Sequence, residues 1–122
     1  MDPVTWRSKI LGAVRDLADA KYQERVWVRG EGPEVDSPTE ALCRLLDDYD
    51  LPGFLDRAAR EGWLADRRLA ALEALAAALE GDGRHGPDRS GHDLSSPHWQ
   101  RVRTLARKTL VTFGETSEAR VL

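Results

Sequence analysis

The aspartates of RLLDDYDLPGFL, residues 44–55, are the residues of this chain whose types and spacing most suggest chemistry. Asp47, Asp48 and Asp50 fall within four positions, where a helix is expected to end. Carboxylates are unfavourable there, because the unpaired carbonyl groups of a helix C-terminus carry partial negative charge. Asp50 precedes a Leu-Pro pair and is expected to cap the following helix. Asp47 and Asp48 are left without a local structural role.

Adjacent carboxylates make an awkward pair for acid and base catalysis. Neighbours on a helix point about 100° apart, whereas glycoside hydrolysis needs two carboxyl groups that face one cleft. With Asp50 they offer hard oxygen ligands, but the spacing of an EF-hand is missing. Cys43, the single cysteine, has no nearby histidine or basic pair to activate it, so we expect a small buried side chain. The sequence therefore predicts that the protein is not an enzyme.

Three histidines, His85, His92 and His98, lie in and after a Gly-rich segment, at spacings of seven and six residues. These spacings match no zinc-binding pattern, and we interpret the side chains as solvated. The segment GDGRHG also lacks the spacing of a phosphate-binding loop and follows a helix rather than a strand. We predict no metal and no cofactor, and leave open whether the histidine loop binds a metal.

Charge is distributed unevenly along the chain. The formal net charge is −3, with 18 basic and 21 acidic residues, so no positive excess points to nucleic acid or to an anionic membrane surface. Residues 31–56 contain eight acidic residues against Arg44 alone, a net charge of −7. The last helix has four cations and no acid, but no exposed aromatic residue interleaves with them, so nucleic acid is a disfavoured partner. These cations are Arg101, Arg103, Arg107 and Lys108.

The acidic segment contains residues with a structural explanation and residues without one. Negative charge is favourable near a helix start, which accounts for Asp36 and Glu40. Asp47 and Asp48 have two interpretations: surface ion pairs with arginines of the next helix or with the last helix, worth about 0 to 1 kcal/mol, or contact with a basic protein partner. The predicted partner-binding residues are Glu40, Asp47, Asp48 and Asp50.

Amphipathic periodicity and capping signals predict an all-α fold, a compact bundle of about five helices. Gly62, Gly81 and Gly114 are expected to end helices. The four tryptophans are expected in the core or at its edge: Trp6, Trp27, Trp63 and Trp99. Three helix starts pair an N-cap residue with proline at the first helical position: Asp2 and Pro3, Ser37 and Pro38, Ser96 and Pro97.

The chain is long enough to bury a core without a disulfide or a metal, so residues 1–122 are expected to form a single helical domain. Residues 82–93 contain no large apolar side chain and predict a mobile loop, and residues 115–122 predict a frayed tail. Whether residues 26–36 form a short strand is left open. No signal sequence or membrane-spanning stretch is evident, which with the lone cysteine predicts a cytoplasmic protein with no membrane segment.

The segments LADAKYQERVW, LLDDYDL and SSPHWQRVRTLARKTL resemble a group of small uncharacterised actinomycete proteins. The shared features are a YQ-x-x-x-W segment, an aliphatic residue followed by Asp-Asp, and a terminal Pro-x-Trp helix. This chain departs from that pattern between Gly30 and Leu42, where the group has longer extended segments. The resemblance implies a bacterial protein and supplies no catalytic residues.

The small size and acidic charge also resemble those of immunity proteins from contact-dependent inhibition systems. That resemblance implies an antagonist that binds a basic partner. The function predicted from the sequence is therefore a non-catalytic protein-interaction module with a basic protein partner and an oligomeric state left open. The alternative is a small-molecule-binding or enzymatic helical bundle with a pocket near the histidine loop.

Overall fold

The computed structural model describes residues 2–84 and 94–114, and all regular elements within these two ranges are helical. No strand occurs in those two ranges, which confirms the predicted all-α fold. Two short π-helical turns, η1 and η2, continue the α-helices that precede them. The elements in order are α1 (Pro3–Ala18), α2 (Ala20–Tyr22), η1 (Gln23–Val28), α3 (Pro38–Cys43), η2 (Arg44–Asp48), α4 (Leu51–Glu61), α5 (Asp66–Arg84) and α6 (Pro97–Thr112).

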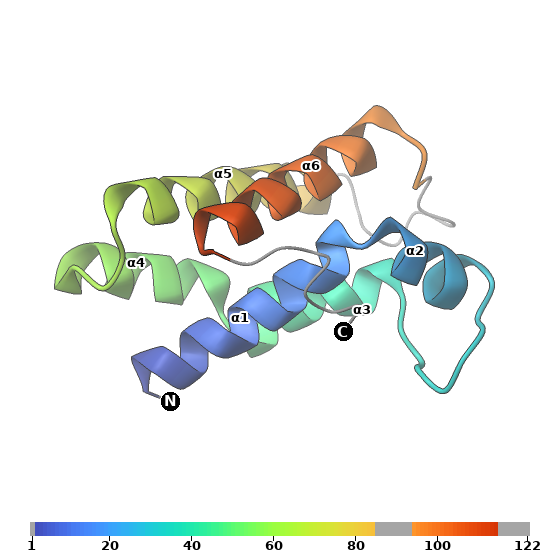
Figure 1. Ribbon diagram of the computed structural model, residues 1–122, viewed down its shortest axis with the longest axis horizontal. Coiled ribbons are helices and arrows are strands. Elements are labelled where there is room, and N and C mark those ends of the chain that lie inside the picture. Colours follow the sequence, from blue (N-terminus) through green and yellow to red (C-terminus); the bar gives the residue numbers. More distant parts are fainter. Residues whose placement is uncertain (1, 85–93, 115–122) are drawn as a thin grey trace.

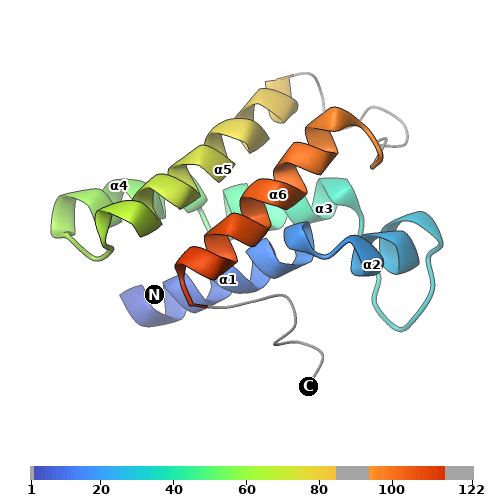
Figure 2. The ribbon, with the colours of Figure 1, turned by 45° about the horizontal axis from the view of Figure 1, so that its top comes forward.

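The helices form two layers around one apolar core. Helices α5 and α6 lie side by side in one layer, with α1, α3 and α4 in the other (Figure 1). Helix α6 packs against both α1 and α5, and lies between them in the turned view (Figure 2). The side chains that are fully buried between the layers include Leu17, Leu45, Leu51, Phe54, Leu72, Leu75, Leu79 and Leu110.

The predicted helix starts are confirmed by hydrogen bonds from the first turn of each helix to its cap. The Asp2 carboxylate accepts a hydrogen bond from the Thr5 amide at 2.9 Å. The Ser37 hydroxyl accepts one from the Glu40 amide at 3.0 Å, and Ser96 caps α6 in the same way. Each cap satisfies an amide that has no partner inside the helix.

The predicted helix end at Gly81 is wrong, because α5 continues to Arg84. Glycine costs only about 1 kcal/mol relative to alanine inside a helix, which the burial of the leucines on the preceding turns offsets. The predicted mobile loop at residues 82–93 therefore begins too early, and its remainder lies outside the described residues, as does the tail at 115–122. The strand left open at 26–36 is not found, since Gln23–Val28 is π-helical.

The prediction that Cys43 is buried is also wrong, because its side chain is exposed. Cys43 follows the buried Leu42 and precedes Arg44, where α3 passes into η2. Of the tryptophans, Trp99 is buried, and the other three are partly buried against the core. Their predicted place in the core or at its edge is confirmed.

Asp50 is confirmed as the cap of α4, in a backbone conformation that ordinary residues rarely adopt. Its φ is 47°, in the left-handed region, and its carboxylate accepts a hydrogen bond from the Gly53 amide at 3.1 Å. A Cβ atom on Gly53 would overlap that carboxylate. The turn thus needs a short acceptor side chain at 50 and no side chain at 53.

We expect Asp50→Ala to lower the free energy of unfolding by about 0.5 to 2 kcal/mol, because the cap is lost. Gly53→Ala should also destabilise, although alanine is normally the better helix residue, because its Cβ displaces the carboxylate. Asp50→Asn is the control: it keeps an acceptor and tolerates the left-handed conformation, so its urea denaturation midpoint should stay near that of the wild type. Equal midpoints for Asp50→Ala and Asp50→Asn would contradict the assigned cap.

Candidate functional site

The four predicted partner-binding residues all lie exposed on the stretch from the first turn of α3 to the cap of α4. The structure gives two of them a local role: Glu40 accepts a hydrogen bond from the Ser37 hydroxyl at 3.3 Å, and Asp50 caps α4. The side chains of Asp47 and Asp48 make no hydrogen bond or ion pair with any residue that the structure describes. We call Glu40, Asp47 and Asp48 the acidic edge.

The arginines expected as surface partners for Asp47 and Asp48 have other partners on their own helix. Arg60 pairs with Asp56 at 2.8 Å, and Arg57 with Glu61 at 3.9 Å. Neither aspartate forms an ion pair with α4 or with α6 among the described residues, so the interpretation as surface ion pairs is wrong for that part of the chain. The alternative interpretation, contact with a protein partner, stays a prediction.

The turn η2 determines how the two aspartates are presented. The Tyr49 amide donates a hydrogen bond to the Arg44 carbonyl at 2.8 Å, five residues back, which is the π-helical pattern. Leu45 is fully buried, while Asp47 and Asp48 are exposed. One face of the turn is thus held in the core while the carboxylates face solvent. Such π-turns are rare and are found frequently at functional sites.

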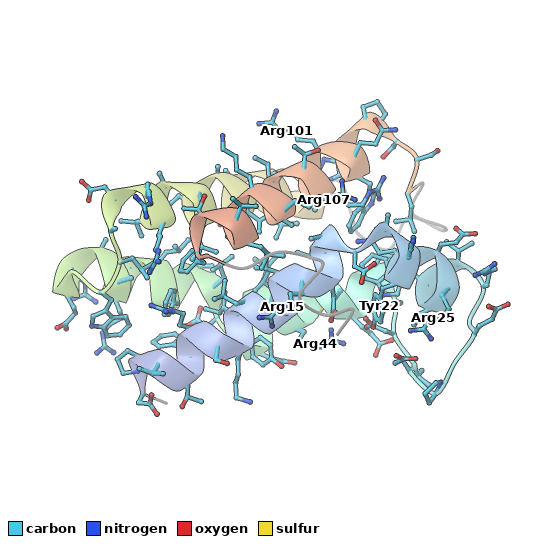
Figure 3. All side chains as sticks on the ribbon, viewed as in Figure 1. Arg15, Tyr22, Arg25, Arg44, Arg101 and Arg107 are labelled. Atoms are coloured by element: carbon cyan, nitrogen blue, oxygen red, sulfur yellow. The ribbon has the colours of Figure 1, made fainter. Side chains whose placement is uncertain are left out.

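A buried carboxylate holds the start of α3 against the second helical segment. The Asp36 side chain is only 3% exposed and accepts three side-chain hydrogen bonds. Tyr22 Oη and Trp27 Nε1 both donate to Oδ2, at 2.8 and 3.0 Å, and Arg44 Nη2 donates to Oδ1 at 2.9 Å. Figure 3 shows Tyr22 and Arg44 projecting toward the same region from different elements. We call Asp36 and its three donors the Asp36 cluster.

The π-helical geometry of η1 explains how two residues of one helix reach the same oxygen atom. Tyr22 and Trp27 are five positions apart, which in an α-helix would place their side chains about 140° apart. A wider π-turn brings such positions closer to one face, and the two rings lie 6.1 Å apart. Asp36 was expected only to favour a helix start. Its role as a common acceptor was missed, because the donors come from separate segments.

The Asp36 cluster shifts the titration of its members. Burial alone would raise the pKa of Asp36, but the hydrogen bonds from Trp27, Arg44 and Tyr22 together hold that pKa below its ordinary value. Burial, and then the hydrogen bond to Asp36, raise the pKa of the Tyr22 phenol. The hydrogen bond to Asp36 raises the pKa of Arg44. At neutral pH the cluster therefore holds an ionised carboxylate, a neutral phenol and a charged guanidinium.

A second polar contact joins α6 to the C-terminal end of α1 through the buried side chain of Gln23. Its amide nitrogen donates to the carbonyls of Asp16 and Leu17 at 2.9 and 3.0 Å, and its oxygen accepts from Arg103 at 3.0 Å. Arg107 donates to the Ala18 carbonyl at 3.1 Å. The positive charge of both arginines complements the α1 carbonyl end. Two of the four cations of the last helix, Arg103 and Arg107, thus have a structural role.

The chain matches a family described as a domain of unknown function, DUF7945, over residues 1–120. It belongs to that family. Comparison with curated proteins and with solved structures gives no match. Among the described residues of this DUF7945 member, no helix has both the length and the apolar character needed to cross a bilayer.

The histidine loop is mostly outside the described residues, which leaves the expected pocket beside it without structural description. His85 and His92 fall in that segment, and His98 lies in the first turn of α6. Within residues 2–84 and 94–114, no three His, Cys, Asp or Glu side chains are grouped to hold a metal ion. The described part of the domain thus offers the acidic edge as its candidate site.

We expect Asp36→Asn to lower the free energy of unfolding by about 2 to 4 kcal/mol, because Arg44 and two ring donors lose a charged acceptor. Glu34→Gln is the matched control on the same connection. Its partner Arg25, at 2.9 Å, is 38% exposed, so loss of this pair should cost less than about 1 kcal/mol. Urea denaturation at pH 7 measures both, and equal losses would contradict the assigned role of Asp36.

The stabilisation by Asp36 should also depend on pH. Because its pKa in the folded protein lies below the ordinary value of 3.8, its contribution is complete above that value and is lost as the pH falls through the folded pKa. The stability difference between wild type and Asp36→Asn should therefore be constant from pH 7 to about pH 5 and shrink below pH 4. A difference that grew on acidification would contradict the depressed pKa.

Proposed function

We propose that this domain is a non-catalytic protein-interaction module that binds a basic partner through the acidic edge. The observation that carries the proposal is the exposure of Asp47 and Asp48 at the end of η2, without an ion pair to any described residue. Their charges lie next to helix-terminal carbonyls, a position that disfavours carboxylates. A basic partner would relieve that unfavourable interaction on binding.

The other carboxylates of residues 31–56 differ from Asp47 and Asp48, and this difference supports the assignment of the acidic edge. Most of them have a cation or a cap within the fold: Glu31 pairs with Arg29 at 3.5 Å, Glu34 with Arg25 at 2.9 Å and Asp36 with Arg44 at 2.9 Å. Internal pairs reduce the field that reaches solvent. The negative potential offered to a partner therefore arises chiefly from Asp47 and Asp48, with Glu40 on the solvent side of the same helical segment.

The more specific form of the proposal is an immunity-like antagonist that acts in the bacterial cytoplasm. Its support is the small acidic chain, with a net charge of −3, and a single exposed cysteine, which suits a reducing compartment. Long-range attraction between an acidic and a basic surface acts mainly on the association rate. An antagonist that must capture its target quickly gains from such steering.

The proposal predicts that Asp47→Asn with Asp48→Asn weakens binding without loss of stability. The melting temperature should stay unchanged or rise slightly, because the substitutions remove two unfavourable negative charges from a helix C-terminus. The basic proteins that wild type recovers from native lysate should then be purified and their association rates measured at rising salt. The advantage of the wild type should shrink with salt, since surface charges are screened over about 8 Å at physiological ionic strength.

Glu73→Gln with Glu80→Gln is the matched control, because it removes two exposed charges from α5. A purified partner should bind this control like the wild type. Equal weakening by the two double variants would indicate a general effect of net charge and would overturn the assignment of the acidic edge. Unfolding of Asp47→Asn with Asp48→Asn would show that the aspartates are structural.

A further inference from the structure

A small open cavity lies at the other end of the domain from the Asp36 cluster, between the first turn of α1 and the region where α4 passes into α5. Both segments lie at the same end of the molecule in Figures 1 and 2. The cavity has a volume of about 160 Å³ and is lined by Pro3, Val4, Arg7, Phe54, Trp63 and Leu64. No residue of the acidic edge lines it, so it is independent of the proposed function.

The aromatic wall of this cavity is held in place by contacts outside it. Phe54 is buried, and its ring lies 5.8 Å from that of Trp63. Trp6 packs edge-on against both rings, at 5.3 and 6.1 Å, and donates from Nε1 to the Tyr49 carbonyl. The Arg57 guanidinium lies 5.2 Å from the centre of the Trp63 ring. A ligand would therefore meet the ring of Trp63, which Phe54, Trp6 and Arg57 hold in place, and this preformed surface lowers the cost of ordering on binding.

Arg7 gives the cavity a positive charge that the described fold does not neutralise. Its guanidinium lies 5.7 Å from the centre of the Phe113 ring, and it makes no ion pair or hydrogen bond with any described residue. The nearest acid in sequence, Asp2, is occupied by the amide and hydroxyl of Thr5. The N–H donors of the Arg7 guanidinium are therefore available to a carboxylate, which a guanidinium binds in a bidentate geometry.

We propose that this cavity binds a small aromatic carboxylate, with its ring against the partly buried Trp63 and its carboxylate on Arg7. An apolar cavity of about 150 Å³ holds one benzene ring, whereas drug-sized ligands need about 300 Å³ or more. A single ring fills the apolar part of the space. Arg7, the one cation among the lining residues, then favours a ring with an anionic substituent over a ring with a neutral one.

The test titrates the purified protein, residues 1–122, with phenylacetate and with the neutral isostere phenylacetamide. The NMR signal of the Trp63 indole N–H reports on the cavity. Phenylacetate should give a saturable shift with a Kd on the order of 1 mM, as expected for a ligand of this size, and phenylacetamide should bind at least about fivefold more weakly, because it lacks the charge that pairs with Arg7.

Three variants sharpen this test. Arg7→Gln should reduce phenylacetate binding to the level of phenylacetamide and leave phenylacetamide unaffected. Val4 is 78% exposed, so Val4→Trp should fold and block both ligands. Val111→Trp is its control, at a site on α6 that is 64% exposed and does not line the cavity, and should bind normally.

Three results would each overturn this proposal: no saturable shift in wild type at 20-fold the expected Kd, equal affinity for the acid and the amide, or undiminished binding by Val4→Trp. The first two need no variant, so the proposal stays testable even if Arg7→Gln fails to fold. None of these measurements involves the acidic edge. Failure here therefore leaves the proposed interaction with a basic partner unaffected.

Discussion

The arrangement of the first half of this domain depends on one buried carboxylate, that of Asp36. An ionised group that is 3% exposed is stable only when donors replace the water that it has lost. Tyr22, Trp27 and Arg44 provide that replacement from both sides of the connection between η1 and α3. Without it, the connection would lose its anchor, and α3 with its acidic edge would lose a fixed orientation.

Ring packing joins this anchor to the helical core. Trp27, a donor in the Asp36 cluster, lies 5.8 Å from Trp99 of α6. Arg103 and Arg107 of the same helix bind Gln23 and the last carbonyl of α1. Helix α6 therefore contacts both ends of the turn between α1 and η1. The position of the acidic edge follows from a continuous set of contacts that runs from α6 through η1 to Asp36.

Features that depend on local sequence were predictable, and features that depend on distant partners were not. The caps at Ser37 and Asp50 involve residues three positions apart, and the exposure of Asp47 follows from helical period alone. The Asp36 cluster needs donors 8 to 14 positions away in the sequence. It also needs a π-turn, which the hydrophobic periodicity of the sequence does not predict. The burial predicted for Cys43 is wrong because residue type is a weak guide to burial for a small side chain, and this one lies between a buried leucine and an arginine. The aromatic cavity was missed because its walls come from helices at opposite ends of the first 64 residues.

The exposure of Cys43 makes the domain a convenient reporter of its own contacts. It is the only thiol in the chain, so a maleimide dye or a spin label attaches at one defined point without prior removal of competing cysteines. That point lies on the helical segment that also carries Glu40 and Asp47. A label there would sense changes in solvent access or distance at this surface in otherwise native protein, and the rate of thiol alkylation would report on the same surface without any label.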